Sequence, residues 1–141
     1  MDVSFKLTNT LSELNRLEAQ LQLVRKRWSL NKKVEAEINL VLEELVTNII
    51  THGDQDHSRT IEIHISKHER QLTIIIEDDG PPFNPTLTAS PDTTLPLEKR
   101  ECGGLGIHFV CQFTDHREYK RSGDKNIFTM RKILPKECGT Q

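Results

Sequence analysis

The sequence lacks a charge surplus of either sign. It has 19 lysine and arginine residues against 21 aspartate and glutamate residues, which gives a net charge of -2 at pH 7. Domains that bind nucleic acid usually carry a basic surplus, and acidic interaction tails form runs of like charge. Neither feature is present, so we expect no nucleic-acid partner.

Long apolar runs are also missing. No segment approaches the roughly 20 apolar residues that a membrane-spanning helix requires. The N-terminus has no apolar segment of the kind found in signal peptides. We therefore expect a cytoplasmic location and no membrane association.

Cysteines are few. Cys102, Cys111 and Cys138 are odd in number and include no Cys-x-x-Cys pair. Disulfide frameworks and structural zinc sites generally use cysteines in pairs. We therefore expect the three side chains to be reduced thiols, as is usual in the cytosol.

The most apolar stretch covers residues 38–53. Eight of its first thirteen residues are Ile, Leu or Val, and it has no Pro and no Gly before Gly53. This composition predicts a helix that is largely buried. Glu44 and Asn48 are four residues apart, so both project from one face of that helix. Because burying them without partners is costly, they either face solvent along a narrow strip or line a polar cavity.

Hydrophobic periodicity predicts the other elements. Strands are expected where apolar and polar residues alternate or apolar residues dominate, and helices where apolar residues recur every three or four positions. The expected strands are 3–7, 60–66, 71–77, 116–121 and 126–134, the last two forming a hairpin, and the further helices are 11–28 and one beginning near 103. Thr10 and Glu13 have the spacing of a capping box at the start of the first helix.

One long segment, residues 84–102, has no periodicity and is rich in Pro, Thr and Ser. A loop of that length inside a compact domain is either a functional lid or disordered. The remaining elements fit an α+β fold, a two-layer sandwich with helices on one face of a mixed, largely antiparallel sheet. We expect a single domain over residues 1–134, followed by a C-terminal tail over residues 135–141.

Two short motifs suggest ligand binding. Asp78 follows the apolar strand 71–77, where its carboxylate can accept a hydrogen bond from an exocyclic amino group while Gly80 leaves room for a flat base. A plain Asp-Gly turn is the alternative. The glycines at 103, 104 and 106 open a helix whose N–H groups can hold phosphate oxygens, although glycines also begin ordinary helices.

Other ligand signatures do not fit. The glycines match neither the P-loop nor the dinucleotide fingerprint, because no Gly-Lys-Ser/Thr follows and no strand leads into them. The six histidines include no His-Glu-x-x-His or other spacing of metal ligands. We expect them to be solvated or structural, with His52 as the exception to watch, because it continues the stripe of Glu44 and Asn48 on the helix.

Glu44-x-x-x-Asn48, Asp78-x-Gly80 and the segment 103–106 occur in this order along the chain. They resemble the N, G1 and G2 boxes of the GHKL ATPase superfamily, whose nucleotide-binding domain is called the Bergerat fold. The likeness covers about residues 34–110, and segments 44–53 and 78–83 look most like the anti-sigma-factor serine/threonine kinase branch. Pro82 departs from the pattern, because many members have a second glycine there.

The resemblance implies a role for each matching residue. Asp78 would bind the adenine amino group of ATP, Asn48 would supply an amide oxygen to Mg²⁺, and Glu44 would act as the catalytic general base. The glycine segment would bind the phosphates while residues 84–102 close as a lid. The implied nucleotide-binding residues are Asn48, Asp78, Gly80, Gly103, Gly104, Leu105 and Gly106.

The function implied by this resemblance is that of an ATP- and Mg²⁺-dependent serine/threonine protein kinase. Its expected partners are a small antagonist protein, which it phosphorylates, and a sigma factor, which it sequesters; a homodimer is left open. Two alternatives remain. One is an ATP-binding regulatory switch without catalysis, and the other is the ATPase module of a larger two-component or phosphatase signalling system.

Overall fold

The computed structural model describes residues 2–52, 59–85 and 107–136. In chain order its strands and helices are β1 (Asp2–Thr8), α1 (Leu14–Trp28), α2 (Lys32–His52), β2 (Thr60–His68), β3 (Gln71–Asp78), α4 (His108–Phe113), β4 (His116–Ser122) and β5 (Lys125–Ile133). A short 3-10 turn, Leu11–Glu13, precedes α1. The strand bounds agree with the predicted ones to within two residues, whereas α2 begins six residues before the predicted helix 38–53.

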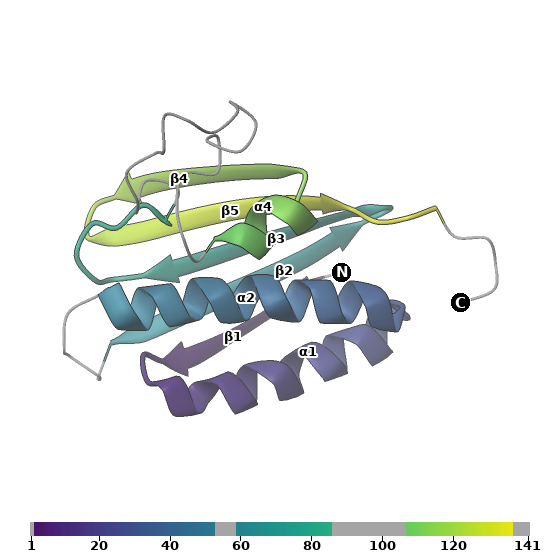
Figure 1. Cartoon of the computed structure of the whole chain (residues 1–141), viewed down its shortest axis with the longest axis horizontal. Helices are drawn as coiled ribbons and strands as arrows, with labels where there is room; N and C mark the ends of the chain where they lie inside the picture. The colour runs from purple at the N-terminus through teal and green to yellow at the C-terminus, as the bar shows by residue number, and fades with distance from the viewer. Residues whose placement is uncertain (1, 53–58, 86–106, 137–141) are drawn as a thin grey trace.

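The five strands form one sheet in the order β1-β2-β3-β5-β4, and each neighbouring pair is antiparallel. The strand with the most apolar sequence, β3, lies at the centre, where both of its edges are paired. Helices α1, α2 and α4 cover one face of this sheet (Figure 1). The structure therefore confirms the predicted α+β fold with helices on one face of the sheet, and the described sheet is antiparallel throughout rather than mixed.

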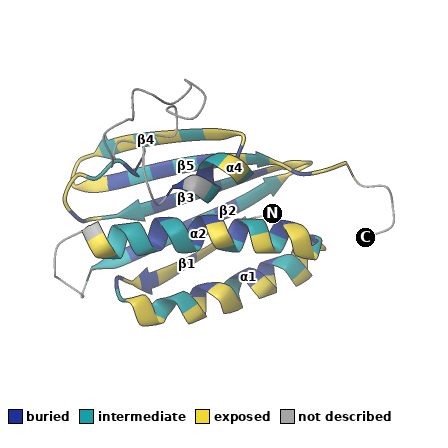
Figure 2. Cartoon of the chain, in the orientation of Figure 1, coloured by how far each residue is buried: buried dark blue, intermediate teal, exposed yellow. Residues whose placement is uncertain are grey.

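The core lies between this sheet and the helices (Figure 2). Ile61, Ile63 and Ile65 alternate with half-buried polar residues along β2 and are almost inaccessible to solvent. They face the apolar side of α2, where Leu42 and Leu45 are also buried. The inward residues of the alternating strands and the apolar residues of α2 thus form one hydrophobic core between the sheet and the helix.

The link between α1 and α2 is set by local hydrogen bonds. Ser29 adopts a left-handed conformation, with φ at 55°, and ends α1 because the chain turns away from the helix axis there. Asn31 then begins α2, since its Oδ1 accepts a hydrogen bond from Val34 N at 2.8 Å. An ion pair between Arg25 and Glu35 joins the two helices. No described helix is long and apolar enough to cross a membrane.

The predicted capping box at Thr10 and Glu13 is wrong. The Thr10 side chain makes no capping hydrogen bond, and the residues after it form the 3-10 turn. Glu13 instead reaches back to the end of β1, where its Oε1 accepts hydrogen bonds from Thr8 N at 2.9 Å and Thr8 Oγ1 at 3.2 Å. The Glu13 carboxylate thus accepts hydrogen bonds from the last residue of β1 rather than from the start of a helix.

The expectation of three reduced thiols is also wrong. Cys111, in α4, is part of a disulfide. The other two cysteines, Cys102 and Cys138, lie outside the described residues. An odd number of cysteines without a Cys-x-x-Cys pair therefore did not exclude a disulfide.

Candidate functional site

Asp78 is the last residue of β3, and its half-buried carboxylate is held in one orientation. Its Oδ1 accepts hydrogen bonds from the backbone N–H of Gly80 at 2.9 Å and from Asn126 Nδ2 at 3.1 Å. A Cβ atom at residue 80 would lie 3.0 Å from this oxygen, so any larger residue there would push the carboxylate from its position by a few tenths of an ångström. The predicted pairing of Asp78 with Gly80 is therefore a local structural unit.

Asn126, at the start of β5, organises the wall of this site. Its side-chain amide donates to Pro81 O at 2.9 Å as well as to Asp78. Its Oδ1 accepts hydrogen bonds from Phe83 N at 3.0 Å and from the Tyr119 hydroxyl at 2.5 Å. One buried side chain thus fixes the carboxylate and the segment that follows β3 relative to β5.

Burial raises the pKa of Asp78 above its ordinary value of 3.8. The hydrogen bonds from Asn126 and Gly80 and the Arg121 guanidinium oppose this effect, whereas the neighbouring Asp79 carboxylate adds to it. A carboxylate withdrawn from water and already oriented forms a strong hydrogen bond with a donor that enters its pocket.

Two hollows flank Asp78, and Ile49 and Phe83 line both of them. The first extends towards Thr60 and Ile61 at the start of β2. The second lies over the core-facing side of β3 and β5, and its walls are mostly apolar. Apolar walls with a few fixed polar groups are typical of small-molecule sites. A flat base with an exocyclic amino group has the matching chemistry, because Asp78 can accept from that group.

Glu44 contacts α4. Its Oε1 accepts hydrogen bonds from the backbone N–H groups of Phe109 at 3.0 Å and Val110 at 3.3 Å. These donors belong to the first turn of α4, whose N–H groups have no partner within the helix. The carboxylate therefore links α2 to the start of α4, which comes directly after the glycine segment. Its role as general base stays a prediction.

Asn48 lies one turn after Glu44 on α2 and is half-buried. The next residue, Ile49, lines both hollows, so this end of α2 borders the pocket of Asp78. An amide oxygen is a hard donor of the kind that Mg²⁺ accepts, so Asn48 fits the role of a magnesium ligand chemically. The predicted phosphate-binding residues Gly103, Gly104, Leu105 and Gly106, and residues 86–102 of the predicted lid, lie outside the described residues.

Three residues at the site were not predicted from the sequence. Arg121 donates to Gly80 O at 2.8 Å, and Arg59 donates to Asp79 O at 2.6 Å, so the two guanidinium groups hold the turn after β3. The third is Asn126. It was detectable in principle, because it occupies an inward position in the alternation that continues with Phe128 and Met130. The arginines give no such signal.

Known proteins resemble the chain in sequence. It matches the family described as the histidine kinase-like ATPase domain over residues 7–132. Serine/threonine-protein kinase BtrW of Bordetella bronchiseptica (strain ATCC BAA-588 / NCTC 13252 / RB50) is 26% identical over 108 residues, which cover 76% of this chain and 75% of BtrW.

Solved structures resemble it in fold. The RsbU and RsbW domains of Rv1364c from Mycobacterium tuberculosis match with a TM-score of 0.66 and 13% identity, over 95% of this chain and 32% of that one. The catalytic domain of histidine kinase ThkA matches with a TM-score of 0.51 and 14% identity, over 95% of this chain and 99% of that one. These identities show a shared fold. Because the family match covers most of the sequence, the chain belongs to the histidine kinase-like ATPase (GHKL) family and is an ATP-binding domain.

Proposed function

We propose that this protein is a serine/threonine protein kinase of the anti-sigma-factor type. It uses ATP with Mg²⁺ to phosphorylate a small antagonist protein, and it sequesters a sigma factor. One observation favours a kinase over other ATPases of the family: a protein named as a serine/threonine-protein kinase, BtrW, aligns with three quarters of the chain, at 76% coverage. We place the protein in the cytoplasm, where both partners and ATP are found.

The Asp78 pocket accounts for recognition of adenine. The carboxylate is oriented by Gly80 and Asn126 and lies between two hollows with apolar walls. An acceptor-only group at this position favours a base with an amino group over one with a carbonyl oxygen. Asn48 is the proposed magnesium ligand, on the part of α2 that borders the pocket.

Glu44 is the proposed general base. When bound, ATP supplies the phosphoryl group, and Glu44 takes the proton from the attacking hydroxyl group of the partner. The same carboxylate holds the first turn of α4 through Phe109 N and Val110 N. Proton transfer and the position of α4 therefore depend on one side chain.

That double engagement also favours a second candidate function. A carboxylate whose Oε1 is committed to two backbone donors can act as a purely structural link between α2 and α4. The protein would then be a switch that binds ATP and a partner but transfers no phosphoryl group.

Phosphoryl transfer separates the two candidates. The protein is incubated with Mg²⁺, ATP labelled at the γ-phosphate and antagonist proteins encoded beside its gene. The kinase proposal expects label on a serine or threonine of one antagonist, and it expects Asp78→Asn to lower the labelling when ATP is below saturation. Tight ATP binding without transfer to any of these proteins would leave the switch as the function.

A further inference from the structure

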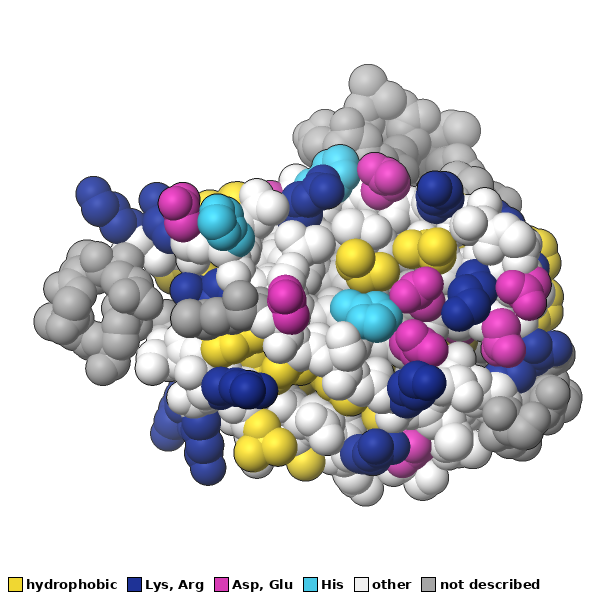
Figure 3. All heavy atoms as spheres, turned by 180° about the vertical axis from the view of Figure 1, so that it is seen from behind, with side chains coloured by type: hydrophobic (Ala, Val, Ile, Leu, Met, Phe, Trp, Pro, Cys, Tyr) yellow, Lys and Arg dark blue, Asp and Glu magenta, His cyan; other side chains and the backbone are white. Residues whose placement is uncertain are grey.

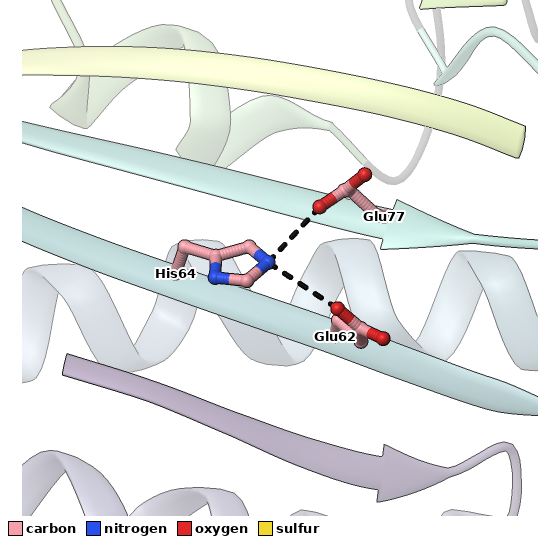
Figure 4. Close-up of side chains that lie close together, drawn as sticks. All are labelled: Glu62, His64 and Glu77. Carbon is pink, nitrogen blue, oxygen red and sulfur yellow. Dashed lines mark ion pairs between the residues drawn. The ribbon is translucent and has the colours of Figure 1, made fainter. Parts of the chain in front are cut away.

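A histidine and two glutamates lie together on the sheet face that the helices leave open. Figure 3 shows this face, where histidine and acidic side chains meet among lysine and arginine side chains. Glu62 and His64 project from β2, and Glu77 projects from the neighbouring β3 (Figure 4). One donor atom from each of the three lies within 4.8 Å of the other two.

Strand register places the two carboxylates side by side. Glu62 and Glu77 are direct partners in the antiparallel β2–β3 pair. Like charges at such positions repel each other and destabilise the pairing unless a cation lies between them. Lys6, on β1, offsets part of this repulsion. Its Nζ lies 3.7 Å from Glu62 Oε1, so Glu62 Oε2, which faces His64, is not its partner.

His64 points its ring between the two carboxylates. Its Nε2 is 2.9 Å from Glu77 Oε2 and 3.4 Å from Glu62 Oε2 (Figure 4). Its other ring nitrogen, Nδ1, is 2.8 Å from Ser4 Oγ on β1. Histidines that bind metals usually have the second ring nitrogen held in this way, which fixes the ring orientation and leaves Nε2 for the ion.

We propose that Glu62, His64 and Glu77 form a binding site for a divalent transition-metal ion, with Zn²⁺ as the best fit. One imidazole nitrogen and two carboxylate oxygens are a common zinc ligand set, and water completes the tetrahedron. Ligands about 2.1 Å from a tetrahedral zinc ion lie about 3.4 Å from one another. The separation of 3.4 Å between Nε2 and Glu62 Oε2 matches that value, and Glu77 Oε2, at 2.9 Å, would move outwards to admit the ion.

The ligand set also selects against other cations. Mg²⁺ and Ca²⁺ prefer sites made of oxygen donors alone, whereas imidazole favours zinc and its neighbours in the periodic table. The side chains are accessible enough for an ion and its water to enter, with exposed fractions of 36% for His64, 28% for Glu62 and 24% for Glu77.

The site is separate from the proposed magnesium ligand. Glu77 immediately precedes Asp78, and successive residues of a strand point to opposite faces of the sheet. The ion would therefore bridge β2 and β3 on the face behind the nucleotide pocket, whereas Asn48 belongs to a helix that covers the other face (Figure 1). The proposal does not depend on kinase activity.

Calorimetric titration with Zn²⁺ tests this site. Tag-free protein is stripped with a chelator and titrated without nucleotide, so that no phosphate binds the ion. We expect the wild type to have a zinc site that His64→Ala weakens at least tenfold, and that Glu77→Gln weakens similarly. Mg²⁺ should not compete with zinc there. Zinc should also raise the midpoint of thermal unfolding of the wild type more than that of His64→Ala.

His116→Ala is the matched control. His116 is exposed on β4, and its Nε2 has one carboxylate nearby, Glu118 at 3.7 Å, so its loss should leave zinc affinity unchanged. Circular dichroism confirms folding of each variant, and Glu77→Gln replaces His64→Ala if the latter does not fold. Equal zinc affinity in the wild type and the folded variant, or no zinc binding by the wild type, would mean that the three residues form only an ion-pair network.

Discussion

Asn126 lies directly opposite Asp78 in the β3–β5 pair, and its side-chain amide donates a hydrogen bond to the Asp78 carboxylate. The same amide group binds Pro81 O and Phe83 N, so the orientation of the carboxylate and the shape of its pocket depend on one residue. A polar residue that is 4% exposed and fully hydrogen-bonded is a rigid support for a binding site.

Asp78→Asn should weaken ATP binding. An asparagine can keep the acceptor for Gly80 N, but its NH₂ group would face the amino group of adenine, so two donors would meet. We expect at least a tenfold loss of affinity, about 1.4 kcal/mol, measured by calorimetry. Asp79→Asn, at the exposed neighbouring position, is the control and should bind ATP as the wild type does. An unchanged ATP affinity in Asp78→Asn would remove Asp78 from the site.

The raised pKa of Asp78 predicts a pH-dependent stability. The unfolded chain loses the proton near pH 3.8, whereas burial keeps it on the folded protein to a higher pH. Between pH 3.8 and the higher pKa of the folded state, the folded protein binds more protons than the unfolded chain. The free energy of unfolding therefore falls as the pH rises through this range. Urea unfolding from about pH 3 to about pH 7 should show this fall in the wild type, relative to Asp78→Asn. Parallel curves for the two proteins would contradict it.

Glu44→Gln should separate catalysis from structure. Glutamine can still accept hydrogen bonds from Phe109 N and Val110 N, so the link between α2 and α4 is kept. It cannot take up a proton, so phosphoryl transfer should fall about 10²–10⁴-fold while ATP affinity changes little. Single-turnover transfer assays and calorimetry measure the two effects.

Glu43→Gln is the control for this variant. Glu43 is the neighbouring carboxylate, and its Oε1 accepts a hydrogen bond from Asn39 on the same helix. Transfer should be unchanged in this control. If transfer falls with Glu43→Gln and not with Glu44→Gln, then Glu43 is the base and Glu44 is a structural link.

Asn126→Asp should disrupt the pocket. The substitution removes both N–H donors, leaves Pro81 O without its partner and places a second carboxylate against Asp78. We expect ATP affinity to fall at least tenfold and the free energy of unfolding to fall by about 1–3 kcal/mol at neutral pH. Asn15→Asp, on the exposed side of α1, is the matched control. Equal stability and ATP affinity in both variants would show that Asn126 does not support the site.

The fold was predictable because its elements bury apolar residues with regular periods. Ile61, Ile63 and Ile65 alternate along β2, and α2 is apolar enough to be recognised as a buried helix. The prediction of a capping box was wrong because the Glu13 carboxylate accepts its hydrogen bond from Thr8 N, at the end of the preceding strand. A local spacing predicts which partners are within reach, but not which competing partner the folded chain supplies.

The site was predictable only in part. The position of Asp78 after a buried strand was visible in the sequence, and so was the pairing of Glu44 and Asn48 on one helix face. The partners of Glu44 lie 65 and 66 residues further along the chain, and no local pattern encodes that contact. The ligand set around His64 was likewise not predicted from the sequence, because its neighbour Glu77 lies on another strand.

The strand order has a consequence for synthesis on the ribosome. The last described strand, β5, pairs with the central strand β3. Until β5 has emerged, a growing chain presents β3 as an apolar edge with unpaired backbone groups, which invites pairing with other chains. Truncated products that stop before Asn126 should therefore aggregate, and they also lack the residue that orients Asp78.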